Sequence, residues 1–378
     1  MKILEKEDIY FLVQQNQREV AELDLIKKQI QAQPTNLSQG PFNRNDLYKA
    51  VLYEDMHKDG FVMQYPHGMV VRQSDRHWHY RGESACYPFS QPTFIRKLTN
   101  KTKEEREVFE FVANLRLFEF FKLLEKLNHY QDFRNIHFQI GETRIFLDTL
   151  FYNIAQHYGF DTNWLDITSD FETALFFACC KFSNNNWLPL KKKDFDKNGE
   201  SKYGRIFRRA VNDFRNNFPE NKYTVLPVGF QPFMRCHMQY SYGIVMEEGM
   251  DLNNPESGFE CLKFRHSAEL SNYIYSKMNH GSLIYPQEGL KVLSGELKEI
   301  QNCSFFSVES FESVYKNLNF GYSEAELRIL LKKNGIKIGA VKTRVGQTKI
   351  DIVNRLYEKF DIEESYNIKL RTRLTYTP

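Results

Sequence analysis

The 378-residue sequence lacks the features of a membrane-spanning or disulfide-bonded protein. No apolar run approaches the length of about 18 residues that suggests a transmembrane helix. The opening segment, MKILEKEDIYFLVQQ, carries charges too early for a signal peptide. The six cysteines include no C-x-x-C pair, and Cys179 and Cys180 stand within an apolar run, so we expect buried free thiols and no zinc site. These absences predict a protein of the reducing cytoplasm that makes no membrane contact.

A strong charge of one sign is also missing. The formal net charge is +3, which gives no general case for nucleic acid as a partner. The excess lies at the C-terminal end, where residues 323–378 hold 12 Lys and Arg against 7 Asp and Glu. Aromatic side chains, by contrast, are abundant at 15%. A chain of this length and composition is long enough for more than one folded unit.

The patterns along the chain predict three parts. Residues 1–40 have apolar side chains at helical spacing and predict an amphipathic helical segment, which either packs on the domain or dimerises. Residues 41–305 alternate short apolar strands with helices, including a long helix over 103–127, and predict an α+β domain. Residues 322–362 predict two helices whose apolar side chains pack on each other, so that this small all-α tail is separable from the remainder.

The most informative stretch is AQHYGFDTNWLDITSDFETALFFA, residues 155–178. Apolar spacing from Leu147 to Tyr158 predicts a helix that Gly159 ends, with His157 in its last turn. An extended segment follows, and Ser169 or Asp170 then caps a second helix that is apolar on nearly all sides and therefore buried.

Two interpretations of these polar residues remain open. In the structural one, Thr168, Ser169 and Asp170 satisfy helix amides, and His157 is a core histidine. The other starts from Asp166, which stands between Leu165 and Ile167 and is therefore expected at or near the core. A buried carboxylate needs a partner, and the cationic candidates are Arg81 and His157.

The same stretch resembles the signature of the FRG domain: Ala-Gln-His-Tyr-Gly, then Thr, then Leu-Asp-x-Thr, then Ala-Leu-x-Phe-Ala. HWHYRGES supplies the aromatic-Arg-Gly motif of that family as Tyr80, Arg81 and Gly82. MRCHMQYSYGIVM supplies a third element with Arg235, Gln239 and Gly243, and the resemblance extends over roughly residues 60–300.

The order of these motifs is similar to that of the arginine–serine–glutamate ADP-ribosyltransferases, which hold NAD in the cleft of a split sheet. The resemblance implies NAD as substrate, with no metal. It implies that a strand arginine grips the pyrophosphate, that its glycine allows close approach, and that a hydroxyl orients the nicotinamide ribose. The expected cofactor-binding residues are Tyr80, Arg81, Gly82 and Thr162, and the expected catalytic residues are His157, Asp166, Thr168 and Gln239.

Gln239 stands where those transferases usually carry glutamate, and three alternatives follow. The carboxylate of an active transferase is Asp166; or Gln239 only positions the ribose 2′-hydroxyl; or the domain has lost catalysis and binds a nucleotide-like ligand. Each residue also has a structural alternative: Arg81 pairs with Glu83 at the surface, and Gln239 is a hydrogen bonder at a sheet edge.

The tail resembles the SAP module, a helix–extended–helix element of nucleic-acid-binding proteins. Its Glu326-Leu327, Leu330-Leu331 and Gly335 match the first helix and the turn, and Arg355-Leu356 match the second helix. This resemblance implies DNA or RNA as a partner, held through phosphate contacts that weaken with salt. The residues expected to make these contacts are Lys332, Lys333, Lys342, Arg344 and Lys349.

The function expected from these resemblances is transfer of ADP-ribose from NAD to a macromolecular acceptor, a glycosyltransferase reaction, in a toxin-like or anti-phage (phage-defence) role. Nucleic acid is one candidate acceptor. The competing expectation is a non-catalytic module that binds a nucleotide or nucleic acid. Release of nicotinamide from NAD distinguishes the two.

Overall fold

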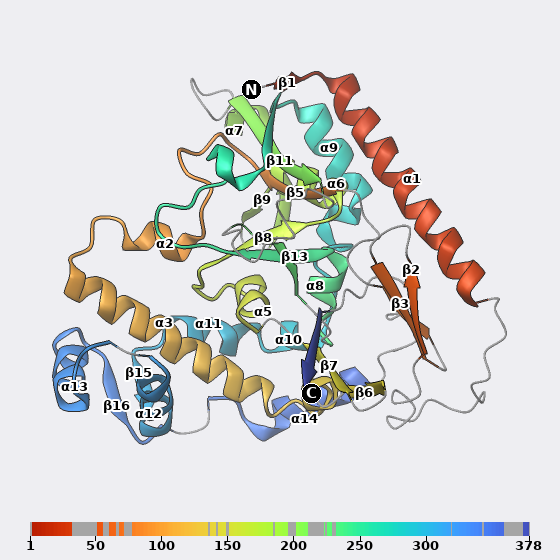
Figure 1. Ribbon diagram of the computed structural model, residues 1–378. Coiled ribbons are helices and arrows are strands. Elements are labelled where there is room, and N and C mark those ends of the chain that lie inside the picture. Colours follow the sequence, from red (N-terminus) through yellow and green to blue (C-terminus); the bar gives the residue numbers. More distant parts are fainter. Residues whose placement is uncertain are drawn as a thin grey trace.

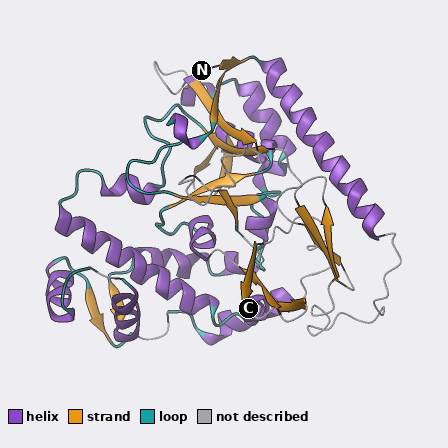
Figure 2. Cartoon of the chain, viewed as in Figure 1, coloured by secondary structure: helices purple, strands orange, loops and turns teal. Residues whose placement is uncertain are grey.

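The computed structural model builds a mixed seven-stranded sheet with helices packed on it (Figures 1 and 2). It describes residues 2–31, 51–55, 60–65, 68–71, 78–134, 137–140, 143–148, 151–183, 186–195, 202–210, 223, 225–228, 232–318, 320–341, 344–358 and 373–377. In spatial order the sheet consists of β1 (Lys2–Leu4), β14 (Glu260–Arg265), β11 (Tyr203–Ala210), β5 (Trp78–Glu83), β8 (Trp164–Thr168), β13 (Ser241–Val245) and β12 (Val225–Pro227). The prediction of a mixed α and β architecture is confirmed.

The two faces of this sheet carry separate cores. On one face, Tyr80, Ile206 and Phe264 pack with helices α1 (Lys6–Gln31), α6 (Phe171–Cys179) and α9 (Ala268–Lys277). On the other, Leu165, Ile167, Phe207, Tyr242 and Ile244 pack with α2 (Thr93–Leu98) and with the loop after β13. Alternation along β8 therefore turns Leu165 and Ile167 to one side and Asp166 to the other.

The sheet opens between β5 and β8. β5 pairs with β11 from Trp78 to Glu83, and β8 pairs with β13 along its whole length. Between β5 and β8 themselves, Tyr80 opposite Thr168 is the one register pair among the described residues. The strands therefore diverge beyond that point. The gap between them is bordered by the C-terminal half of β5 and by the part of β8 that precedes Thr168.

The N-terminal segment is partly as predicted. α1 is one long helix, and its residues Ile9 and Val13 are buried against the domain, so the packing alternative holds for this half of the helix. The sequence analysis missed β1, which pairs in parallel with β14. The N-terminal residues are consequently part of the central sheet.

The remaining strands form small sheets: β2 (Val51–Asp55), β3 (Gly60–Tyr65) and β4 (Gly68–Val71); β6 (His137–Ile140), β7 (Thr143–Asp148) and β17 (Arg373–Thr377); β9 (Cys180–Ser183) and β10 (Asn186–Pro189); β15 (Phe305–Ser307) and β16 (Lys337–Gly339). The remaining helices are α3 (Lys103–Leu124), α4 (Asn128–Arg134), α5 (Phe151–His157), α7 (Lys192–Phe195), α8 (Met234–Met238), α10 (Gly289–Val292), α11 (Ser294–Asn302), α12 (Val308–Asn317), α13 (Glu324–Lys333) and α14 (Gln347–Glu358). Two short 3₁₀ helices cover Pro255–Ser257 and Asn279–Gly281.

The predicted helix–strand–helix order of residues 155–178 is correct, with one boundary error. α5 ends at His157, and Gly159 adopts a left-handed φ of 87°, as a helix-ending glycine should. Asp170 caps α6 by accepting from Thr173 N at 2.7 Å. Leu147, however, lies in β7, because the strand β7 precedes α5 where the apolar spacing predicted continuous helix.

The tail differs from its prediction in two respects. It is not all-α, since β16 pairs with β15 and β17 pairs with β7. Its two helices also bury their described apolar side chains in two separate cores and not in a shared one. Leu327, Leu330 and Leu331 of α13 join the core around the first half of α3, whereas Ile350, Val353 and Tyr357 of α14 join the core around its second half. The long helix α3 contributes residues to both cores.

We therefore expect the chain truncated after residue 322 to unfold. Seven buried side chains of the tail would be lost from two cores, at about 1.5–3 kcal/mol each, which reaches the whole stability of a typical domain. Chemical denaturation followed by circular dichroism measures the effect.

Two substitutions in the full chain form a matched pair for the same question. Leu331→Ala should cost about 2–5 kcal/mol of stability. Leu356→Ala, at a side chain 46% exposed, should cost less than about 1 kcal/mol. A truncated chain with the wild-type denaturation midpoint would show that the tail is separable after all.

Three further features bear on the sequence predictions. All six cysteines are free thiols, and Cys179, Cys180 and Cys236 among them are buried. Among the helices that the structure describes, none combines the length and apolarity needed to span a bilayer. The described residues also contain no group of three His, Cys, Asp or Glu side chains placed to hold a metal ion.

Candidate functional site

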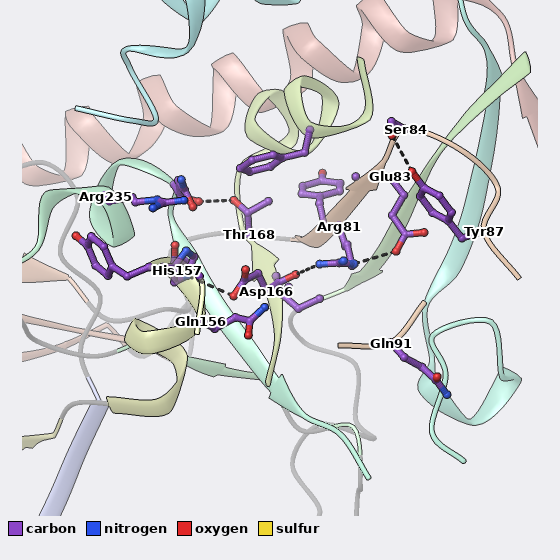
Figure 3. A pocket seen from close by; sticks show the side chains of 18 of the residues that line it. Arg81, Glu83, Ser84, Tyr87, Gln91, Gln156, His157, Asp166, Thr168 and Arg235 are labelled. Atoms are coloured by element: carbon purple, nitrogen blue, oxygen red, sulfur yellow. Dashed lines mark hydrogen bonds and ion pairs between the residues drawn. The ribbon is translucent and has the colours of Figure 1, made fainter. Parts of the chain in front are cut away.

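A cavity of about 580 Å³ lies where β5 and β8 diverge. Most of its lining comes from three segments far apart in the sequence: β5 and its following loop, the α5–β8 segment, and α8 with the residues directly after it (Figure 3). Arg96, Phe177 and Tyr285 add to the lining from other elements. Seven of the eight predicted NAD-site residues line it: Tyr80, Arg81, Gly82, His157, Asp166, Thr168 and Gln239.

Arg81 bridges the opening in the sheet. Its Nε donates to Glu83 Oε1 at 3.0 Å, and its Nη1 donates to the backbone oxygen of Asp166 at 2.8 Å. Glu83 is itself buried and accepts from Arg205 Nε at 2.8 Å and from Ser90 Oγ at 2.6 Å. The predicted pairing of Arg81 with Glu83 is thus present, but beside the cavity and anchored by buried partners. The guanidinium is fixed in place, and Nη2 is the nitrogen that these two bonds leave unused.

Asp166 is not in the core as the sequence predicted, since its side chain is 36% exposed. The alternation of β8 turns it away from Leu165 and Ile167 and into the cavity. Within the described part of the chain, its carboxylate has two long contacts, one to Asn153 Nδ2 at 3.5 Å and one to His157 Nε2 at 3.6 Å. The sequence analysis missed Asn153, although its spacing of four from His157 places both side chains on one face of α5.

Gly243 explains how Asn153 reaches Asp166. Gly243 stands opposite Asp166 in the β8–β13 register, and a Cβ at this position would lie 2.3 Å from Asn153 Nδ2 and 2.6 Å from the Trp164 ring. A side chain here would displace both residues. The glycine of the third sequence motif therefore creates space for the residues behind the cavity.

His157 is buried and faces Asp166. Burial lowers the pKa of its imidazole below the usual range, and the adjacent Asp166 carboxylate only partly offsets this effect. Nε2 has no hydrogen-bond partner in the described part of the chain and lies 3.6 Å from Asp166 Oδ1. A neutral imidazole beside a carboxylate offers two acceptors to a hydroxyl or an amide of a bound ligand.

Thr168 and Gln239 tie the β8 end to the α8 segment. Thr168 Oγ1 donates to the backbone oxygen of Gln239 at 2.7 Å and accepts from Asp170 N at 3.0 Å. Gln239 Nε2 donates to the carbonyl of Ile284 at 2.9 Å, and its side chain also hydrogen-bonds His157. A glutamate could not donate to Ile284, so a neutral amide suits this position. The capping interpretation is therefore correct for Asp170, which Thr168 holds in place, whereas the Ser169 hydroxyl is buried without a hydrogen-bond partner among the described residues.

Gly82 and Thr162 have structural surroundings that the sequence analysis did not predict. A Cβ on Gly82 would lie 1.7 Å from the carbonyl oxygen of Ala174, so this glycine permits close packing of β5 on α6. Thr162 does not line the cavity. Its hydroxyl donates to Gln156 Oε1 at 2.9 Å and accepts from Trp164 N at 3.2 Å, which orients the cavity residue Gln156.

Arg235 is a further cavity residue, quoted in the third motif but not predicted as a site residue. Its guanidinium lies 3.9 Å from the centre of the Tyr285 ring, and Nη2 donates to the Tyr285 hydroxyl. Its Nε is buried without a hydrogen-bond partner among the described residues. The motif spacing could have indicated it, because Arg235 and Gln239 lie one helical turn apart.

The charges around the cavity favour an anionic ligand. Three guanidinium groups line it, those of Arg81, Arg96 and Arg235, against the carboxylates of Glu83 and Asp166. Glu83 is in addition paired with Arg205, which does not line the cavity. A surplus of positive charge in a partly enclosed site attracts groups such as phosphates.

The family comparison identifies one part of the chain. Residues 76–186 match the FRG domain. This match covers less than a third of the chain. The match includes β5, α5, β8 and α6, and with them Arg81, His157, Asp166 and Thr168. It ends before α8, so Arg235 and Gln239 enter the site from outside the matched FRG segment. No curated protein and no solved structure matches the chain.

The predicted nucleic-acid contacts in the tail are mostly engaged with the rest of the chain. Lys333 Nζ pairs with Glu104 at 2.9 Å, Lys349 pairs with Glu296, and Arg344 pairs with Glu119 at 3.4 Å. Lys332 is exposed on α13. Lys342 lies outside the described residues. These ion pairs attach the tail to α3 and α11, which gives the basic residues a structural explanation.

Proposed function

We propose that the cavity binds NAD and that the protein transfers ADP-ribose from it to a macromolecular acceptor. The observation that carries the proposal is the convergence of Arg81, His157, Asp166 and Thr168 with Gln239 at the opening between β5 and β8. The FRG match covers the first four of these residues. NAD offers the groups that such a site suits: a pyrophosphate for the guanidinium, and ribose hydroxyls for the acceptors.

Arg81 would hold the pyrophosphate. Its position is set by Glu83 and by the Asp166 carbonyl, so little conformational freedom is lost when a ligand binds. A planar guanidinium can bond a phosphate while keeping its protein partners, whereas the single ammonium of lysine cannot replace this geometry.

Asp166 and His157 would act on the nicotinamide ribose. In the reaction the bond from ribose C1′ to the nicotinamide nitrogen breaks, and nicotinamide leaves as a neutral molecule with the bonding electron pair. The ribose then carries oxocarbenium-like positive charge, which a nearby carboxylate stabilises. The acceptor atom supplies its lone pair to C1′ and loses a proton to the Asp166–His157 pair. Gln239 is a positioning residue in this scheme, since it hydrogen-bonds His157 and the Ile284 carbonyl.

Replacing Arg81 with lysine tests the proposal. We expect Arg81→Lys to weaken NAD binding at least about tenfold by isothermal titration, because the bond to the phosphate and the bridge to Asp166 cannot both be kept. Arg208→Lys is the matched control: Arg208 lies on the neighbouring strand, pairs with Glu260 at 2.8 Å and does not line the cavity. Equal NAD affinity in wild type and Arg81→Lys, or no NAD binding by the wild type, would contradict the proposal. NAD binding without nicotinamide release would favour the non-catalytic alternative.

A further inference from the structure

The mouth of the cavity has a different character from its interior. The interior residues His157, Thr168 and Gln239 are buried, whereas Tyr87 and Phe89 at the mouth are 42% and 58% exposed. Both belong to the loop that joins β5 to α2, which lies beside the sheet opening (Figures 1 and 3). Two exposed aromatic rings next to a polar cavity offer flat surfaces on which a ligand ring can stack.

The loop that carries these rings is held firmly. Ser90 N donates to Asp251 Oδ1 at 3.0 Å, and Ser90 Oγ donates to Glu83 Oε1 at 2.6 Å. Gln91 Nε2 donates to the carbonyl of Met250 at 2.7 Å. Because the backbone is fixed, the aromatic side chains are presented at the surface before any ligand arrives, and stacking on them costs little ordering entropy.

Positive charge continues from the mouth along α2. Residues 84–103 contain Arg96, Lys97, Lys101 and Lys103 and no Asp or Glu. From other elements, Asp161 pairs with Lys97 at 2.7 Å, and Glu107 lies 3.9 Å from Lys103.

The other two basic residues of this segment form no ion pair within the described part of the chain, although the Glu105 carboxylate is close enough to interact with the charge of Lys101. Arg96 donates to the neutral Thr93 hydroxyl at 2.9 Å, and the Lys101 ammonium lies 5.7 Å from the centre of the Phe109 ring. Arg96 and Lys101 therefore remain for an external anion.

Aromatic rings beside a strip of positive charge form the pattern by which proteins bind single-stranded nucleic acid, with bases stacked and phosphates paired. We propose that Tyr87 and Phe89, with Arg96 and Lys101, bind single-stranded nucleic acid and present one of its bases to the cavity as the acceptor. This inference rests on the proposed function. A nitrogen or oxygen of the base forms the new bond to ribose C1′, nicotinamide departs with its electron pair, and the proton of that atom passes to the Asp166–His157 pair.

Binding of a fluorescent single-stranded DNA or RNA oligonucleotide to the full chain, without NAD, tests the site. In the double variant Tyr87→Ala/Phe89→Ala the affinity should fall at least about tenfold, since stacking contributes roughly 1–3 kcal/mol per base. Phe11→Ala, at a phenylalanine 62% exposed on α1, is the matched control and should bind as wild type. In Arg96→Gln/Lys101→Gln the slope of log affinity against log salt should become shallower by about one to two units. Lys291→Gln/Lys298→Gln, at exposed positions of α10 and α11, should keep the wild-type slope.

Nicotinamide release from NAD without an acceptor separates this inference from the proposed function. Tyr87→Ala/Phe89→Ala should release nicotinamide at the wild-type rate and fail to label the oligonucleotide. Unchanged oligonucleotide affinity in that variant would overturn the inference. A raised KM for NAD together with unchanged oligonucleotide binding would also overturn the inference, because the two rings would then bind the adenine of NAD. Labelling of protein but of neither nucleic acid would also overturn it, while leaving the transferase proposal in place.

Discussion

Asp166→Asn is expected to lower the rate of nicotinamide release by about a hundredfold or more while the protein stays folded. The substitution keeps the shape of the side chain and removes the charge that an oxocarbenium-like state would need. Little stability should be lost, less than about 1 kcal/mol, because the carboxylate is partly exposed and its contacts to Asn153 and His157 are 3.5 and 3.6 Å long. Steady-state release at saturating NAD, with a denaturation curve for the same sample, measures both quantities.

Asp161→Asn provides the control for this experiment. Asp161 lies five positions before Asp166 and pairs with Lys97 rather than facing the cavity. The same chemical change there should leave nicotinamide release within about twofold of wild type, since exposed ion pairs contribute little. Full NAD turnover by folded Asp166→Asn would remove Asp166 from the chemistry. A large loss of stability with turnover intact would assign it a structural role instead.

The second large effect is expected at Gly82, where alanine should destabilise the fold by at least about 3 kcal/mol. The added methyl group would meet the Ala174 carbonyl oxygen at 1.7 Å and its carbon at 2.6 Å. Both are backbone atoms inside α6, so neither can rotate away, and β5 and α6 would have to separate. Urea denaturation of Gly82→Ala against wild type gives the difference in the free energy of unfolding.

Gly295→Ala is the matched control. Gly295 lies in the first turn of α11, and a Cβ there would meet no atom within 4 Å. Alanine also has the better helix propensity, so this variant should be as stable as wild type or more stable by up to about 1 kcal/mol. If Gly82→Ala has wild-type stability, β5 and α6 do not pack as closely as described.

Local structure was largely predictable from the sequence, because it depends on neighbouring residues. Gly159 ends α5 and Asp170 caps α6, as the pattern indicates. The position of Asp166 was not predictable. Period-two alternation shows that Asp166 and its neighbours Leu165 and Ile167 lie on different faces of the strand, but it does not show which of the two faces borders a cavity. That depends on where β5 departs from β8, a contact across more than 80 positions of the sequence.

The same limit applies to the tail and to the site's third segment. Apolar spacing showed that Leu331 and Val353 are buried, yet not that α3 separates them into two cores. The convergence of Arg81 with Gln239 came from the family resemblance and not from hydrophobic periodicity. Charge at a single residue is still harder to interpret: Lys333 and Lys349 suggested a phosphate-binding surface, and the structure pairs both with glutamates of the same chain.

The pairing of the first strand with a late one has a consequence for how the protein is made. Lys2, Ile3 and Leu4 stand opposite Leu262, Lys263 and Phe264, so each residue of β1 waits for a partner that is translated 260 positions later. At about 5–20 residues per second, this wait lasts roughly tens of seconds. During this wait β1 lacks its strand partner, whereas Asn16 of α1 can bond the Asp170 side chain and the Phe171 amide at the start of α6 well before β14 is translated. This edge of the sheet is thus completed only after β14 has been translated, and a nascent chain stopped before β14 would carry the FRG segment without β14 and without a strand partner for β1.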